Sequence, residues 1–158
     1  MPPTPPAATL ALERFLPYRL SILSQLVSGS IHDQYFEPSG LSIPQWRVMA
    51  VLGRFAPLSA GEVGERTLLD KVTVSRAVAA LLDRRLIARA TDSDDRRKSA
   101  LILTGEGRRL HGHVAGLALD YEARLLNGLT HAEQRTLDLL LHKLTRHVRS
   151  LRPDANGT

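Results

Sequence analysis

Short polar signals mark where helices begin along this chain. Three of them are capping boxes, in which a Ser or Thr is followed three residues later by Glu or Gln and each side chain bonds the other residue's backbone N–H. Two more are single capping residues, whose side-chain oxygen accepts a hydrogen bond from the first turn. The five signals are Ser42–Gln45, Ser59–Glu62, Asp70, Thr104 and Thr130–Glu133. Helices beginning just after each of these signals predict a mainly α-helical chain.

Apolar residues recur three or four positions apart near both ends of the chain, as they do in amphipathic helices. The first such segment runs from Leu10 to about Phe36, and Pro17 indicates that its regular helix begins near that residue. Towards the other end, a helix from Gly105 to about Leu126 precedes a last helix with a leucine-rich stripe. The stripe consists of Leu137, Leu140, Leu141, Leu144, Val148 and Leu151. We therefore expect long helices on both sides of the central part of the chain.

The period of the apolar pattern changes in the central part. Residues 86–91 and 99–104 are short, strand-like segments, and the polar residues 92–98 lie between them, which predicts a β-hairpin with a charged tip. Only a few residues separate the two helices before this hairpin. That is helix-turn-helix spacing, and a hairpin that follows it makes the unit a winged helix.

The formal net charge of +5 comes from residues 41–109, because the segments on either side are close to neutral. A basic block between near-neutral helical segments indicates a module that binds a polyanion. A solvated basic face with no partner has the same composition, so this alternative stays open.

Composition excludes several other classes of protein. The chain has no cysteine, which excludes disulfides, Cys-ligated metals and thiol-oxidation switches. No apolar run approaches the roughly 20 residues of a membrane helix. The proline-rich residues 1–9 predict a disordered leader and lack the features of a secretory signal. We expect a soluble, cytoplasmic protein.

The sequence has few side chains arranged to bind a metal or to catalyse a reaction. The histidines have no spacing that suits a metal, and we expect them to be scattered surface residues. The sequence shows no nucleophile–base pair, no glycine-rich phosphate loop and no carboxylate pair suited to catalysis. We therefore expect no cofactor, no metal site and no enzymatic activity.

The predicted helix after Asp70 carries candidate DNA contacts on its N-terminal turns. Hydroxyls and cations there can reach base edges and phosphates. The candidates are Lys71, Thr73, Ser75 and Arg76. Three alanines further along, Ala77, Ala79 and Ala80, would let the helix approach a groove closely. An ordinary amphipathic helix with one polar face remains the alternative.

The predicted hairpin tip carries three consecutive cations, Arg96, Arg97 and Lys98. An Arg that flanking strands hold in place can enter the narrow, electronegative minor groove. Asp95 can align a guanidinium through a bidentate contact. The alternative is a solvated turn that neutralises itself, because three aspartates in the loop balance the cations.

Taken together, these segments resemble the MarR (multiple antibiotic resistance regulator) family of winged-helix transcription factors. Residues 41–52, 69–78 and 92–99 carry the resemblance, with the Leu-Thr-x-x-Gly motif of residues 103–107. Helices on either side extend it over about residues 10–150. The resemblance implies that Asp95 orients a groove-entering Arg97, and that Arg96 lies at a more variable position of the wing.

The family resemblance also implies a homodimer with interleaved terminal helices. Residues 10–40 and 105–152 would form the helical dimerisation region, and residues 41–104 the winged-helix DNA-binding domain. The sequence supports this independently, because a domain of about 70 residues cannot bury both the leucine stripe and the first long helix. An intramolecular helical bundle is the alternative.

Family members commonly respond to small phenolic or aromatic ligands bound between the dimer helices and the winged helix. The segment at residues 15–21 is similar to that of regulators of aromatic-acid catabolism. Tyr18 and Trp46 could sandwich a ring, and Arg19 could hold a carboxylate or an acyl-CoA phosphate. The alternative is that the two aromatic residues belong to the core and that Arg19 is a surface cation.

The predicted function is a ligand-responsive, homodimeric repressor of a catabolic or efflux operon. A small aromatic acid or its CoA thioester would release it from a pseudo-palindromic operator in double-stranded DNA. Two alternatives remain: a winged-helix activator or architectural protein with no small-molecule effector, and a protein–protein module that never touches DNA.

Overall fold

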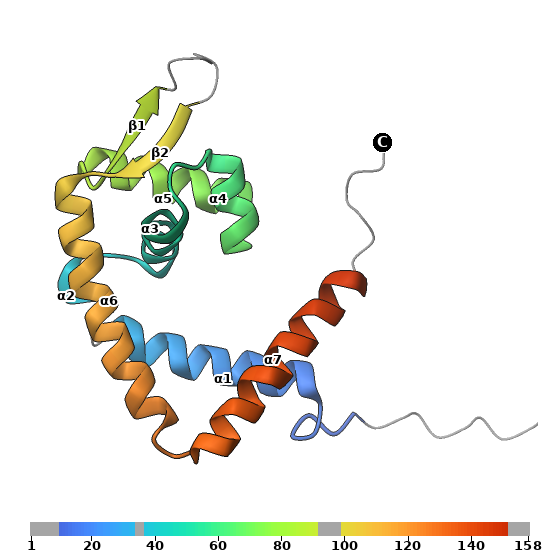
Figure 1. Ribbon diagram of the computed structural model, residues 1–158. Helices are drawn as coiled ribbons and strands as arrows, with labels where there is room; N and C mark the ends of the chain where they lie inside the picture. Colours follow the sequence, from blue (N-terminus) through green and yellow to red (C-terminus); the bar gives the residue numbers. More distant parts are fainter. Residues whose placement is uncertain (1–9, 34–36, 92–98, 152–158) are drawn as a thin grey trace, which may run out of the picture. The chain divides into compact units, whose positions relative to one another are not determined.

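The computed structural model describes residues 10–33, 37–91 and 99–151. Helices make up most of it, and the only regular sheet among these residues has two strands (Figure 1). The chain divides into two compact units, Met1–Ala118 and Leu119–Thr158, and one helix runs across the division. The predicted mainly α-helical fold class with a winged helix is confirmed. The predicted disordered leader lies outside the described residues.

The first unit contains the helix-turn-helix and the hairpin. Helices α3, α4 and α5 pack against one another, and the hairpin packs against α3 and α5. The elements of this unit are α1 (Leu16–Ile31), α2 (Glu37–Ser39), α3 (Ile43–Phe55), α4 (Ala60–Thr67), α5 (Lys71–Asp83), β1 (Ile87–Thr91), β2 (Ser99–Leu103) and the first part of α6 (Gly105–Leu126). The second unit holds the end of α6 and α7 (His131–Leu151). No helix in the described part of the chain is long and apolar enough to span a bilayer.

All three predicted capping boxes form. In the first, the Ser42 N–H donates to the Gln45 side-chain oxygen at 2.9 Å, and the Gln45 N–H donates to the Ser42 hydroxyl at 3.3 Å. The boxes that open α4 and α7 repeat this exchange with glutamates in place of glutamine. Because such a cap stabilises a helix by about 1 kcal/mol, these short-range bonds fix where each helix starts.

Helix α1 is shorter than the apolar pattern suggested. It begins at Leu16 and not at Leu10, where the apolar pattern starts, which confirms the prediction that the regular helix begins near Pro17. Pro17 lies in the first turn, where its missing N–H leaves no intrahelical bond unmade, and earlier residues cannot continue the helix through it. None of the residues of α1, all of which are described, is buried.

The core of the first unit lies where the helices meet the hairpin. The largest fully buried side chains include Met49 of α3, Leu81 of α5 and Leu101 of β2, and Val114 of α6 joins them with no exposed surface. The strands pair antiparallel from Ile87–Leu103 to Thr91–Ser99. Leu58 adds a bridge to the free edge of β2, because its N–H and carbonyl both bond Leu101, at 3.3 and 2.7 Å. The hairpin is thereby anchored on both sides of β2.

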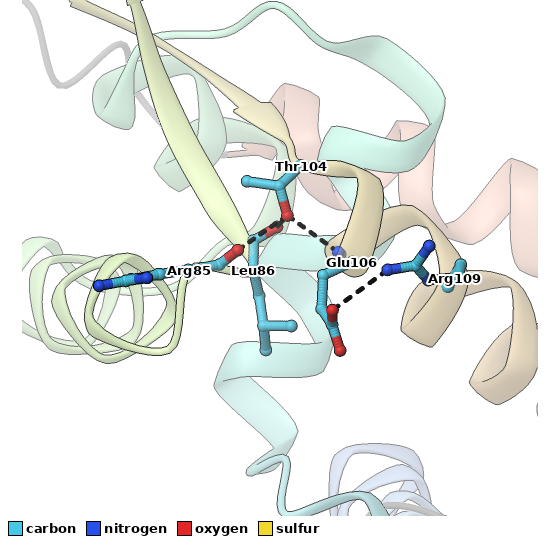
Figure 2. Close-up of polar contacts among 6 residues, drawn as sticks. Arg85, Leu86, Thr104, Glu106 and Arg109 are labelled. Atoms are coloured by element: carbon cyan, nitrogen blue, oxygen red, sulfur yellow. Dashed lines mark hydrogen bonds and ion pairs between the residues drawn. The ribbon is translucent and has the colours of Figure 1, made fainter.

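Thr104 connects the hairpin to α6 (Figure 2). Its hydroxyl donates to the carbonyl oxygen of Arg85 at 2.8 Å and accepts the Gly107 N–H at 3.0 Å, which confirms the predicted helix cap. Its backbone N–H donates to the Leu86 carbonyl at 3.0 Å. One residue thus ends β2, starts α6 and bonds the segment that leads into β1.

Candidate nucleic-acid interface

The N-terminus of α5 is fixed by Asp70. One carboxylate oxygen accepts the Thr73 N–H at 2.9 Å, and the other accepts the Thr73 hydroxyl at 2.6 Å. These bonds, from the hydroxyl first and then from the backbone, lower the pKa of Asp70. The carboxylate therefore stays ionised next to the positive end of the helix dipole, which orients the first turn of α5.

Helix α5 has one buried face and one exposed face. Val74, Ala77, Val78 and Leu81 are buried in the core of the unit. Lys71, Ser75 and Arg76 are exposed, and Ala79 is exposed beside them. The prediction that Ala77 lets the helix approach a groove is wrong, because Ala77 lies three residues after Val74 and four before Leu81 and is buried on their side of the helix.

Three of the four predicted DNA-contact residues on this helix are exposed, and the side chain of the fourth bonds another residue of the protein. Thr73 is only partly exposed, and its hydroxyl donates to Asp70. Lys71, Ser75 and Arg76 therefore form the accessible polar surface of the N-terminal half of α5. A cation, a hydroxyl and a guanidinium on one face of a helix can donate to phosphates and to base edges.

The turn before α5 is short and tightly bonded. Leu68 adopts the left-handed conformation, with φ of 55°, and ends α4. The buried Thr67 hydroxyl donates to the Val63 carbonyl at 2.8 Å and accepts the Leu69 N–H at 3.4 Å. Three residues, 68–70, thus separate α4 from α5, which confirms the predicted helix-turn-helix spacing.

The C-terminal end of α5 is held by Arg84, which sequence reasoning missed. Its guanidinium donates to the carbonyl oxygens of Gly40 at 2.6 Å and Ser39 at 3.1 Å. Gly40 has a φ of +66°, a conformation that favours glycine and turns its carbonyl group towards Arg84. No local sequence pattern connects residues that lie 44 positions apart. The only signal in the sequence was a glycine just before a capping box, which is typical of a turn.

The wing is described at its base and not at its tip. Thr91 and Ser99 pair across the hairpin where the loop begins and ends. Asp95, Arg96, Arg97 and Lys98 lie outside the described residues, so their DNA contacts stay predictions. The predicted pairing of the two strands on either side of this loop is confirmed.

The predicted ligand residues occupy two places. Tyr18 and Arg19 line a groove of about 530 Å³ along α1, together with Leu16, Leu20, Leu23 and their neighbours. Trp46 is not among the described residues that line it. Its ring instead stacks on His111 of α6, with centroids 5.5 Å apart and planes 23° apart. The α1 groove therefore contains two of the three predicted ligand residues.

His111 also differs from its prediction as a surface histidine. It is half-buried, and burial lowers its pKa. A β-carbon at Gly53 would come within 2.5 Å of the imidazole Nε2, so the absence of a side chain at Gly53 makes room for the ring. The stacked pair thus joins α3 to the first half of α6.

The helix-turn-helix and the first strand of the wing are similar to those of a known family of regulators. Residues 39–98, which include the turn, α5 and β1, match the model of the MarR family. A MarR/EmrR family transcriptional regulator from Acinetobacter sp. ADP1 has the same fold, with a TM-score of 0.82 and 27% identity. The alignment covers 89% of this chain and 99% of that protein. The central segment of the chain is therefore similar in sequence to MarR-family transcriptional regulators, and the described fold is similar to theirs.

Other proteins similar to this chain are also transcriptional regulators. The HTH-type transcriptional regulator TtmR of Methylorubrum extorquens is 33% identical over 97 residues, which span 61% of this chain and 49% of TtmR. The match therefore covers about half of that relative's length. An HTH-type transcriptional repressor of Mycobacterium tuberculosis is 26% identical, over 82% of this chain and 91% of its own. The structure of Bordetella bronchiseptica BpsR, whose DNA binding is regulated by 6-hydroxynicotinic acid, is similar at a TM-score of 0.73, with 28% identity and coverage of 82% and 98%. MarR family members are transcription regulators and not enzymes.

Proposed function

We propose that this protein is a homodimeric, DNA-binding transcriptional repressor in the cytoplasm, and that a small aromatic acid or its CoA thioester releases it from a pseudo-palindromic operator of a catabolic or efflux operon. The observation that carries the proposal is the division of α5 into a buried apolar face and an exposed face with Lys71, Ser75 and Arg76. The core and the Asp70 cap hold that exposed face in one orientation.

DNA binding would use α5 and the wing together. Helix α5 would lie in the major groove, where the N-terminal residues of a recognition helix contact base edges. Ser75 and Arg76 would donate to bases, and Lys71 to phosphate. Arg97, aligned by Asp95, would enter the adjacent minor groove, and Arg96 and Lys98 would add phosphate contacts.

Dimerisation would bury the apolar surface of the terminal helices. Leu140 is 56% exposed, and no residue of the fully described α7 is buried. Leu20, Leu23 and Leu26 of α1 are likewise exposed. Apolar side chains in such numbers on two helices favour a partner surface of the same kind, and a two-fold axis would supply it from a second copy.

An effector of the aromatic-acid class would suit Tyr18 and Arg19. An aromatic ring can pack on the Tyr18 face while Arg19 holds the carboxylate in a bidentate contact. BpsR, which is similar in fold, is regulated by an acid of this class. Trp46 would join the site if the ligand reached the α3 side, where its ring stacks on His111.

The proposal is tested by DNA binding at several salt concentrations. A duplex from upstream of the protein's own gene should bind, and the logarithm of the affinity should fall steeply with the logarithm of salt as counterions are released. Absence of this slope would indicate a protein–protein module. Thermal shifts with benzoic, salicylic and hydroxynicotinic acids and their CoA thioesters should then identify the effector class. If every compound leaves the melting temperature unchanged, a regulator without a small-molecule effector is indicated.

A further inference from the structure

Helix α5 carries one apolar residue that is exposed and lies outside the core. Among its residues, all of them described, Val72 is the only apolar side chain larger than alanine on the exposed surface. It is 58% exposed, whereas Val74 and Val78 on the same helix are at most 5% exposed. Val72 therefore contributes much less buried surface to the core than these two valines do.

Local helix propensity does not explain this valine either. A β-branched side chain loses rotamer freedom in a helix and is a weaker helix former than alanine or lysine. The cap of α5 is supplied by Asp70 and Thr73, and neither bond involves the Val72 side chain. Neither packing nor helix formation in the described structure accounts for this choice of residue.

The position of Val72 places it inside the polar surface described above. It follows Lys71 directly, and Ser75 and Arg76 lie three and four residues later, which puts them beside it on the same face of the helix. Side chains of a helix lean towards its N-terminus. Val72 thus projects from the first turn of α5, the part of a recognition helix that reaches base edges.

The major groove offers one apolar group to such a side chain. Each base pair presents donors and acceptors there, and only thymine adds a C5-methyl group. We infer that Val72 is a specificity-determining residue that reads a thymine methyl in each operator half-site, next to the bases contacted by Ser75 and Arg76. The inference rests on the proposed DNA-binding function.

The test uses the full-length protein and a duplex selected by it from a random-sequence library. Each thymine of one half-site is replaced in turn by uracil, which pairs identically and lacks only the C5-methyl. At one thymine the wild type should lose about fourfold in affinity, the factor expected for removing one buried methyl-sized group. Val72→Ala should bind the thymine and uracil duplexes equally, and Val72→Thr, which keeps one methyl, should show a smaller difference.

A matched variant separates this effect from general loss of apolar surface. Leu68 is 68% exposed and lies in the turn before α5, so Leu68→Ala should keep the full uracil effect. If no thymine is sensitive to its methyl, or if Val72→Ala loses as much as the wild type on the uracil duplex, the inference is overturned while DNA binding stands. If the library yields no enriched sequence, the proposed function fails and the inference with it.

Discussion

The backbone carbonyl oxygen of Leu86 occupies the space that a β-carbon at Gly107 would need. Gly107 is buried in the first turns of α6, and Leu86 leads into β1, so the helix and the hairpin are in backbone contact at this point. Thr104 adds its bonds to Arg85 and Leu86 within the same turn. The absence of a side chain at Gly107 permits this close approach.

We expect Gly107→Ala to destabilise the protein by about 1–3 kcal/mol, the range for forcing an extra carbon into a packed site. The sign of the change in the free energy of unfolding tests this contact, because Gly→Ala at an open helix position stabilises a protein by up to about 1 kcal/mol. Gly112 of the same helix serves as the control, since a β-carbon added there would meet nothing within 4 Å. Denaturant unfolding should therefore shift in opposite directions for Gly107→Ala and Gly112→Ala.

The stacked His111 predicts a pH dependence of stability. Burial lowers its folded-state pKa below the ordinary 6.5, so the unfolded chain binds a proton more readily. This contribution to the free energy of unfolding is complete above the unfolded pKa and is lost as pH falls from about 6.5 towards the folded pKa. Urea unfolding between pH 5 and 8 should show a shallower decline for His111→Phe, which keeps a ring against Trp46. His113→Phe, at an exposed position, should retain the wild-type profile.

Arg76 and Lys71 should differ in what their loss does to DNA binding. Arg76→Ala should cost about 1–3 kcal/mol at the preferred sequence and reduce discrimination against mismatched duplexes. Lys71→Ala should weaken all duplexes similarly and reduce the salt slope by about one. Anisotropy titrations with preferred and scrambled duplexes distinguish the two. Arg109→Ala, which removes an exposed cation of α6, is the control (Figure 2).

The leucine stripe of α7 should be required for dimerisation. Leu140→Asp places a charge where burial of a leucine would contribute about 1.5–3 kcal/mol, so we expect monomers or insoluble protein and loss of operator binding. Leu139 is equally exposed, at 53%, and points away from the stripe, so Leu139→Asp should remain dimeric. Light scattering at micromolar concentration gives the mass of each variant. A well-folded wild-type monomer would contradict the dimer proposal.

The wing should act as one unit. Arg97→Ala removes the cation that we propose enters the minor groove, and Asp95→Ala keeps the cation but releases its orientation. Both should weaken operator binding, and the double variant should lose less than the sum of the two. Arg97→Ala should also flatten the salt dependence by about one counterion if the guanidinium lies against phosphate. If Arg97→Ala leaves the operator affinity and the salt dependence unchanged, the tip is only a solvated turn that does not contact DNA.

The features that the sequence predicted correctly are those set by local chemistry. The capping boxes depend on residues three apart, and each one forms with the expected bonds. The hairpin is marked by a change of apolar period, and its two strands pair as predicted. These signals need no knowledge of the rest of the chain, which is why the winged helix could be predicted.

The features that sequence reasoning missed depend on contacts between distant residues. Arg84 bonds Gly40 across 44 positions, and His111 stacks on Trp46 from an even more distant part of the chain. A histidine on an exposed helix and one packed on a tryptophan look alike in the sequence. Ala77 was grouped with Ala79 and Ala80 as a small residue that lets the helix approach a groove, whereas its spacing from Val74 and Leu81 places it in the core.

The burial of Val114 has a practical consequence for studying the DNA-reading part alone. Val114 has no exposed surface, and Leu110, one turn earlier, packs against the same core. A protein truncated at the end of the hairpin would therefore expose part of that core to water, and the exposed apolar surface would favour aggregation. Expression of the isolated winged helix for spectroscopy should continue to about residue 118, where the first compact unit ends.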